Sequence, residues 1–227
     1  MKSLFAGISA VLICASGTAS AGTGCTIAPD VVRSLQAQLA TVVTLDNGGL
    51  FSPNRMWSAV VDRAGTLCSV IYIGDAWPGS RAIAIAKAET GNDFSNTALA
   101  ISTANLYAPT QPGGSLYGLN NSNPFNPELL KNNEGLGDDP GGIITFGGGL
   151  ALYKGGKVIG GLGVSGDTSC ADHVIAYRMR RAAGLDAIPA GPNSSGNDNI
   201  EYPPAGSPPT GFQQPHCLPT DIPPGDI

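Results

Sequence analysis

Residues 157–176 read KVIGGLGVSGDTSCADHVIA, which predicts a strand, a glycine-rich turn and a helix in immediate succession. The segment 161–166 matches the G-x-G-x-x-G pattern of dinucleotide-binding proteins, and an acidic residue follows about 20 positions later. That fingerprint belongs to a β-α-β unit, in which a parallel strand follows the helix. Here the strand pairs back with residues 143–153 through a turn at 154–156, and no strand follows the helix at 169–185. We therefore interpret the glycines as positions where the backbone turns or packs closely.

The chain before residue 142 supplies the other elements of the predicted fold. Apolar residues three or four positions apart predict helices, and alternating apolar residues predict strands. The expected elements are a helix at 30–45 with Asp30 as its cap, strands at 56–62 and 66–73, a helix at 81–89 capped by Ser80, and a short helix at 96–106. The resulting order is α-β-β-α-α-β-β-α. Two hairpins favour an α+β fold around a largely antiparallel sheet.

The first 21 residues have the organisation of a secretory signal peptide. Lys2 gives a positive start, an apolar run follows at 4–14, and Ala19-Ser20-Ala21 fits the small-x-small cleavage rule. The apolar run is shorter than the about 20 residues that a membrane-spanning helix needs, and no later stretch is apolar enough. We therefore expect cleavage after Ala21 and a secreted or periplasmic protein without a membrane span.

The charge balance excludes one class of partner. The chain carries 17 acidic and 12 basic residues, which gives a net charge of −5 at pH 7. Proteins that bind nucleic acid present a clustered basic surface, and this composition does not supply one. We therefore expect no nucleic-acid partner.

Cysteine usage predicts two disulfides. Removal of the signal peptide takes Cys14 away and leaves four cysteines, which are Cys25, Cys68, Cys170 and Cys217. An even number in an oxidising compartment favours a disulfide framework, and four cysteines allow three pairings. We favour Cys25–Cys68 and Cys170–Cys217, because each of these bonds would fasten a terminal segment to an element of the core.

These features divide the mature chain into a domain and a tail. A single domain is expected at 22–185, and it contains a loop at 107–142 that is rich in Pro, Gly and Asn. That loop is longer than an ordinary connection, which favours a functional role or an insertion. Residues 186–227 form a Pro/Gly-rich tail with little apolar periodicity, and Cys217 is expected to tether it.

The sequence holds no readable catalytic constellation. Ser165 does not stand in a G-x-S-x-G nucleophile motif, and the only histidines are His173 and His216. No group of His, Asp and Glu residues has the spacing of a metal site. We therefore favour a binding protein over an enzyme.

The glycine-rich turn and the start of the last helix form the predicted binding site. Backbone amides at a helix start can hold a carboxylate. The residues expected to frame the site are Gly163, Ser165, Gly166 and Thr168. His173 follows in the first turns of the helix, with Tyr177 one turn later, and both are included in the predicted site. Two readings stay open: His173 is either the ligand of a haem iron or an ordinary helical histidine, and the glycines either face a ligand or serve packing.

Three short motifs resemble those of the GlcG/HbpS family of haem-binding proteins. Gly163-Val-Ser-Gly166, with Asp172 six residues later, is similar to the terminal signature of that family. Lys87-Ala-Glu-Thr90 leading to Phe94 resembles its central-helix motif, and Gly147-Gly-Gly149 resembles its segment ahead of the last hairpin. The resemblance covers roughly residues 29 to 184.

The resemblance implies a profilin-like α/β/α sandwich, a homo-oligomer and haem as the bound cofactor. It also implies degradation or sensing of haem, which has been claimed for some members. The chain departs from the family in its long 107–142 loop, its tethered tail, and the presence of Cys170 and His173 where acidic or polar residues are usual. Fold transfers between relatives more readily than function does.

Two functions of different classes follow from these observations. The first is a secreted protein that binds haem or a related small ligand. The alternative is an exported accessory subunit, whose long loop and tail dock onto another extracytoplasmic protein. A haem-degrading enzyme is a third hypothesis, and no set of residues argues for it.

Overall fold

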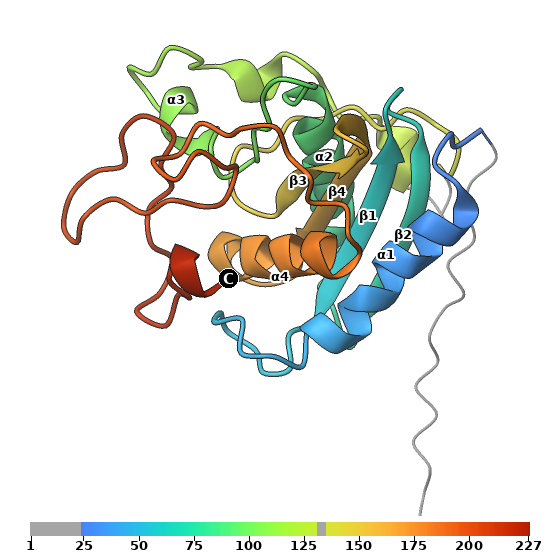
Figure 1. The fold of residues 1–227 in the computed structure, drawn as a ribbon, viewed down its shortest axis with the longest axis horizontal. Helices are drawn as coiled ribbons and strands as arrows, with labels where there is room; N and C mark the ends of the chain where they lie inside the picture. The colour runs from blue at the N-terminus through green and yellow to red at the C-terminus, as the bar shows by residue number, and fades with distance from the viewer. Residues whose placement is uncertain (1–23, 131–134) are drawn as a thin grey trace, which may run out of the picture.

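The protein is built on a central sheet of four antiparallel strands in the order β2-β1-β4-β3. The computed structural model describes residues 24–130 and 135–227, so the predicted signal peptide lies outside the described residues. The strands are β1 (Met56–Asp62), β2 (Leu67–Ile73), β3 (Gly149–Lys154) and β4 (Lys157–Ser165). Helices cover both faces of the sheet (Figure 1), which confirms the predicted sandwich.

Both predicted hairpins form, and they join through β1 and β4 at the centre of the sheet. In this register Trp57 lies opposite both Tyr72 of β2 and Ser165 of β4. The beginning of β1 therefore meets the ends of β2 and β4 at one end of the sheet. This is also the end at which the glycine-rich turn leaves β4.

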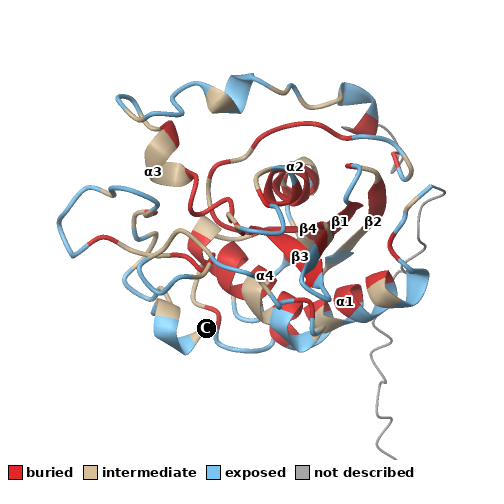
Figure 2. Cartoon of the chain, turned by 45° about the horizontal axis from the view of Figure 1, so that its top comes forward, coloured by how far each residue is buried: buried red, intermediate tan, exposed pale blue. Residues whose placement is uncertain are grey.

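Helix α2 (Ser80–Asp93) packs on one face of the sheet, and its closest contact explains the glycines of β4. A Cβ atom at Gly163 would overlap the carbonyl oxygen of Ala84, and one at Gly161 would overlap that of Ala88. Only a strand without side chains at these positions lets the helix backbone come so near. Figure 2 shows α2 as an almost wholly buried helix.

Helices α1 (Pro29–Val42) and α4 (Ser169–Ala182) cover the opposite face. The main apolar cluster fills the space between them and the sheet, and it includes Leu35, Leu39, Leu162 and Ile175. Figure 2 shows that α1 buries one side and exposes the other, as its apolar spacing predicts.

The predicted helix at 96–106 is wrong, and short polar side chains explain why. Asn96 Oδ1 accepts hydrogen bonds from the amides of Ala98 and Leu99, and the side chains of Ser102 and Asn105 bond to each other's backbone. Such local bonds compete with a helix for the same amides. The segment is a series of turns, and only a four-residue helix, α3 (Tyr107–Thr110), follows it.

Other boundaries also differ from the sequence prediction. Asp30 and Ser80 do not cap their helices, because the N-cap residues of α1 and α2 are Ala28 and Gly79. Residues 143–148 are not part of a strand, because the backbone turns at Gly148 (φ 122°) before β3 begins. The N-cap of α4 is Thr168, since its hydroxyl accepts a hydrogen bond from the amide of Ala171. Short 3-10 helices complete the described elements: η1 (Leu119–Asn121), η2 (Pro127–Leu130) and η3 (Pro224–Asp226).

The tail runs along α4 (Figure 1) and is held by more than its disulfide. Cys170 bonds to Cys217 and Cys25 to Cys68, the pairing that the sequence favours. In addition, the guanidinium of Arg180 binds the carboxylate of Asp198 through two bonds of 2.6 Å, and both side chains are fully buried. The tail is therefore an integral layer over one flank of the domain. Among the described residues, no helix is long and apolar enough to cross a membrane.

Candidate ligand-binding surface

The Lys87 ammonium lies at the centre of the contacts that shape the predicted site. Its Nζ donates to Asp172 Oδ2 at 2.7 Å and to the carbonyl of Val164 at 3.1 Å, and the two charged side chains are buried. Burial raises the pKa of the Asp172 carboxyl, whereas the positive charge of Lys87 acts to lower it. The contact therefore joins the central helix α2 to the last helix α4 across the end of β4.

The amides of the glycine-rich turn are already satisfied within the protein. Asp172 Oδ1 accepts from the backbone N–H groups of Gly166 and Asp167, at 3.1 and 3.0 Å. The carboxylate that we predicted to come from a ligand is thus supplied by the chain itself. This explains why a Gly-Val-Ser-Gly turn is followed by an aspartate six residues later.

The other residues of the predicted site serve the fold in this structure. Gly163 leaves room for the backbone of α2. Ser165 is buried in the sheet opposite Trp57, and Thr168 caps α4. A Cβ at Gly166 would overlap the carbonyl oxygen of Arg55, so this glycine also serves close packing. The turn brings these residues together, but it does not present them as an open anion site.

His173 is buried beneath the tail. Its Nε2 lies 3.0 Å from the amide of Ile200 and 3.2 Å from Asn199 Oδ1, and its ring stacks near Tyr177 at 6.0 Å. Burial lowers the pKa of His173 to about 4, which keeps the imidazole neutral at physiological pH. Coordination of an iron atom through Nε2 would require the tail to move away. The role of His173 as an iron ligand stays a prediction.

The turn organises a neighbouring loop through Asp167. The carboxylate of this residue accepts from the amides of Leu50 and Phe51, at 2.7 and 3.1 Å, and from the side-chain amide of Asn54 at 3.1 Å. Three donors on one carboxylate fix the course of the loop that precedes β1. Phe51 and Arg55 are held on this loop, next to the end of the sheet.

Four aromatic rings and one cation meet at this end of the sheet. We call them the aromatic surface: Phe51, Arg55, Trp57, Tyr72 and Trp77. Trp57 lies 4.8 Å from Tyr72, and Phe51 lies 5.6 Å from Trp77, measured between ring centroids. The guanidinium of Arg55 lies 5.0 Å from the centre of the Phe51 ring.

Solvent reaches much of the aromatic surface, with Tyr72 63% and Trp77 49% exposed. The indole N–H of Trp57 donates to the carbonyl of Trp77 at 2.9 Å, which fixes the turn that carries Trp77. Exposed aromatic rings that cluster are uncommon on a surface without a binding role. Sequence analysis missed this group, although the density of aromatic residues between positions 51 and 77 was a signal.

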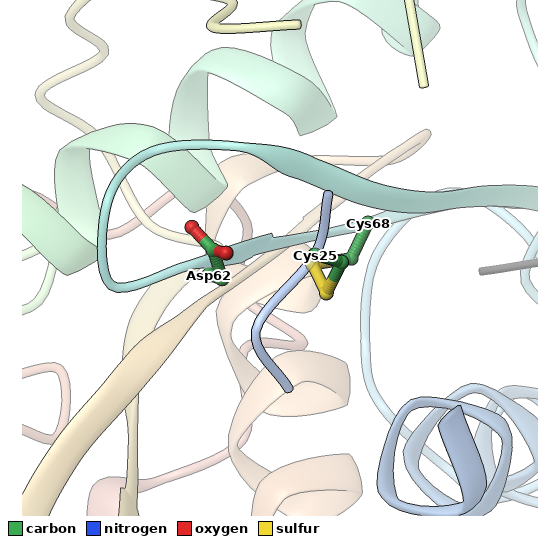
Figure 3. A group of neighbouring side chains, drawn as sticks. All are labelled: Cys25, Asp62 and Cys68. Atoms are coloured by element: carbon green, nitrogen blue, oxygen red, sulfur yellow. A yellow bond between two sulfur atoms is a disulfide. The ribbon is translucent and has the colours of Figure 1, made fainter. Parts of the chain in front are cut away.

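Among the described residues, two cysteine-containing groups have the spacing of metal ligands, and neither fits a metal ion. Figure 3 shows Cys25 and Cys68 joined by their disulfide beside Asp62. Oxidised sulfur atoms are not available as thiolate ligands. The Asp62 carboxylate accepts hydrogen bonds from Thr26, Ala64 and Thr66, so its oxygens are already satisfied. The second group contains the disulfide-bonded Cys170 and Cys217 and is excluded for the same reason.

A family model described as "Haem degrading protein HbpS-like" matches residues 52–180. The chain belongs to the HbpS-like family. The match begins within the loop of the aromatic surface and ends on α4, so the tail of this HbpS-like protein lies outside it.

Relatives of the HbpS-like protein include proteins of different sizes. An uncharacterised 15.0 kDa protein of Citrobacter freundii, from the dhaT-dhaS intergenic region, is 34% identical over 118 residues, which are 52% of this chain and 68% of that protein. The corrinoid adenosyltransferase PduO of the same organism is 33% identical over 108 residues, which are 48% of this chain and only 26% of PduO. The similarity thus concerns a single part of PduO.

Two solved structures share the fold of the HbpS-like protein. Klebsiella pneumoniae protein ORFY has a TM-score of 0.52 and 26% identity, covering 70% of this chain and 90% of its own. The PduOC:heme complex has a TM-score of 0.51 and 27% identity, covering 69% of this chain and 94% of its own. The second of these structures holds a haem group.

Proposed function

We propose that this HbpS-like protein binds haem, or a related flat tetrapyrrole, on the aromatic surface. The observation that carries the proposal is the clustering of two exposed and two partly exposed rings with Arg55, at the end of the sheet that the family signature organises. The family description and the PduOC:heme complex support the choice of ligand class.

The chemistry of the surface suits such a ligand. A porphyrin is a planar apolar ring system, which gains free energy by covering exposed aromatic rings and by stacking on them. Its carboxylates pair well with a guanidinium, and Arg55 lies at the edge of the ring cluster. The phenol oxygen of Tyr72 is exposed and belongs to a class of side chain that can coordinate haem iron. Bound haem would supply its own redox chemistry, and these residues would hold and orient it.

Titration of the purified protein with haemin tests the proposal. We expect a shifted Soret band that saturates at stoichiometric haem. Trp77→Ala and Arg55→Gln should each weaken binding by about tenfold, which corresponds to about 1.4 kcal/mol. Tyr117→Ala is the matched control, because Tyr117 is exposed and lines a different hollow, formed by other residues of the long loop and Thr145.

His173→Ala in the same titration decides between the two candidate sites. The aromatic surface predicts unchanged affinity, because His173 is covered by the tail. Loss of binding in this variant, with full binding by the Trp77 and Arg55 variants, would place the haem at α4 instead and contradict our proposal.

We further propose that the protein acts outside the cytoplasm, because its two described disulfides need an oxidising compartment to persist. Export with cleavage after Ala21 gives a mature chain that begins at Gly22. Intact mass of the exported protein, before and after reduction, checks both the cleavage position and the absence of free thiols.

A further inference from the structure

Residues of the tail line an open cavity of about 560 Å³ that lies outside the residues matched by the family. Four prolines form part of its wall: Pro203, Pro204, Pro223 and Pro224. Prolines have few accessible conformations, so the wall is stiff with little regular secondary structure. A volume of this size falls within the range of about 300–1,000 Å³ that is typical of small-molecule sites.

One carboxylate that lines the cavity has an unused acceptor. The Asp221 side chain is only 1% exposed. Its Oδ2 accepts from the amides of Cys217 and Leu218, at 2.7 and 3.2 Å, and lies 3.5 Å from Nδ1 of His216. Its Oδ1 has no hydrogen-bond partner among the described residues. A buried acceptor of this kind gains free energy from a donor, and most from a charged donor.

A phenol on the same wall is also without a partner. The Tyr202 hydroxyl is buried and makes no hydrogen bond in the described structure. Its ring stacks on the ring of His216, with centroids 4.1 Å apart. Burial raises the pKa of Tyr202, and the charge of Asp221 raises it further, so the phenol keeps its proton. The cavity therefore offers a neutral hydroxyl and an aromatic face beside a carboxylate.

The charge of the residues that line the cavity favours a positively charged ligand. Glu201 contributes a second carboxylate, and no Lys or Arg is among the residues that line this cavity in the described chain. We propose that the tail cavity is a binding site for a small organic cation that carries a guanidinium or primary ammonium group. Its N–H groups meet Asp221 Oδ1, and its methylene groups lie against the prolines and the Tyr202 ring. This site is separate from the aromatic surface and does not depend on haem binding.

Calorimetric titration of the mature, oxidised protein with agmatine tests the site. Agmatine carries a guanidinium and an ammonium on a short methylene chain. We expect binding at one site with a sub-millimolar Kd, and no binding of glutarate, which has two negative charges. Blocked arginine amide is a second test ligand. Its binding would show that an arginine side chain of a peptide can serve as the ligand. Binding of agmatine but not of the blocked amide would indicate a free amine as the ligand. No heat with either cation at millimolar concentration overturns the proposal.

Two variants locate the bound cation. Asp221→Asn retains an oxygen for the amides of Cys217 and Leu218 but replaces the unused acceptor by a donor, so we expect at least about tenfold weaker binding. Tyr202→Phe removes only the hydroxyl and should weaken binding a few-fold. Asp75→Asn, at an exposed carboxylate that does not line the cavity, is the matched control. Full agmatine affinity in folded Asp221→Asn would remove the cavity from consideration. If that variant does not fold, Glu201→Gln takes its place, with the same criterion.

Discussion

At the scale of single residues, the buried charge of Lys87 is balanced by one carboxylate, that of Asp172. The same carboxylate holds the amides of Gly166 and Asp167, so one side chain connects α2, the turn and α4. Transfer of two charges from water into the core is costly, and the contact recovers the cost only while both partners are present. The pair therefore fixes the geometry of the turn rather than adding much net stability.

Replacement of Lys87 by Met tests this role. The variant leaves Asp172 buried without its counter-charge, so the free energy of unfolding should fall by about 3–5 kcal/mol in urea denaturation. The double variant Lys87→Met/Asp172→Asn should recover part of the loss, because no uncompensated charge remains. Lys154→Met, at an exposed lysine at the end of β3, is the control. A single variant within about 1 kcal/mol of the wild type would contradict a coupled pair.

Glu89 of α2 gives a second residue-scale prediction, on pH. Burial raises the pKa of this carboxyl to about 8, and the negative charges of Asp93 and Asp139 contribute to the rise. The unfolded chain releases the same proton near pH ~4.3, so between these values the folded state binds more protons than the unfolded state. Stability should therefore fall as the pH rises from about 4 to 8.

Glu89→Gln removes this titration. The variant should be increasingly more stable than the wild type as the pH rises, with a Tm about 2–4 °C higher at pH 8 if the difference reaches about 1 kcal/mol. Thermal unfolding of both proteins between pH 5 and 8 measures the change. Parallel curves for the two proteins would show that Glu89 does not hold a proton in the folded state.

At the scale of secondary-structure elements, the contact between α2 and β4 depends on missing side chains. Gly161 and Gly163 leave room for the carbonyl oxygens of Ala88 and Ala84, and small alanines on the helix keep its surface flat. Two of the three glycines that resemble a dinucleotide fingerprint thus serve helix-on-sheet packing, and the third, Gly166, packs against the backbone of Arg55. The close contact between α2 and β4 also brings Lys87 within reach of Asp172.

Gly163→Ala is expected to disrupt this packing. The added Cβ would overlap backbone rather than a flexible side chain, so α2 must move, at a cost of at least about 2 kcal/mol. Gly79→Ala is a suitable control, since a Cβ at that position would have no other group within 4 Å and the φ of Gly79 is −64°. Chemical denaturation of the two variants gives the comparison, and equal stability would argue against the tight contact.

At the scale of the whole molecule, the tail forms an additional layer over α4. Besides the disulfide, it contributes Asp198 to a buried ion pair and the amide of Ile200 to His173. The tail also carries Gln214, whose Oε1 accepts from the amide of Gly147 at 2.6 Å. A tail without apolar periodicity is therefore ordered largely by polar contacts with the domain, to which buried Ile200 adds an apolar contact.

Loss of the second disulfide should free only the later part of the tail. In Cys170→Ser, the Arg180–Asp198 pair still anchors the segment before residue 202, so limited proteolysis should cut between 203 and 227 and leave a folded domain. Mass spectrometry of the fragments locates the cuts. Cleavage that begins directly after Asp186 would show that the disulfide alone orders the tail.

The sequence by itself determined an α+β fold around an antiparallel sheet, because the periodicity of apolar residues is a local property that survives in the folded chain. The sandwich arrangement was implied by the resemblance to the GlcG/HbpS family. The sequence also determined both hairpins and the favoured cysteine pairing. It failed at 96–106, where Asn96 and Asn105 bond locally to the backbone, a competition that helical spacing does not reveal.

Only the tertiary structure decided what the signature residues do. The sequence alone does not tell whether the amides of the turn are free or are bound by the carboxylate of Asp172. In the structure Asp172 binds them, and its carboxylate is held by Lys87, which lies 85 residues earlier in the chain. Likewise, the sequence does not show that a distant tail covers His173, or that Asp167 holds the loop of Phe51. Hydrogen bonds and ion pairs act over a few ångströms, so which groups are satisfied and which face solvent is settled only when segments distant in the chain come together.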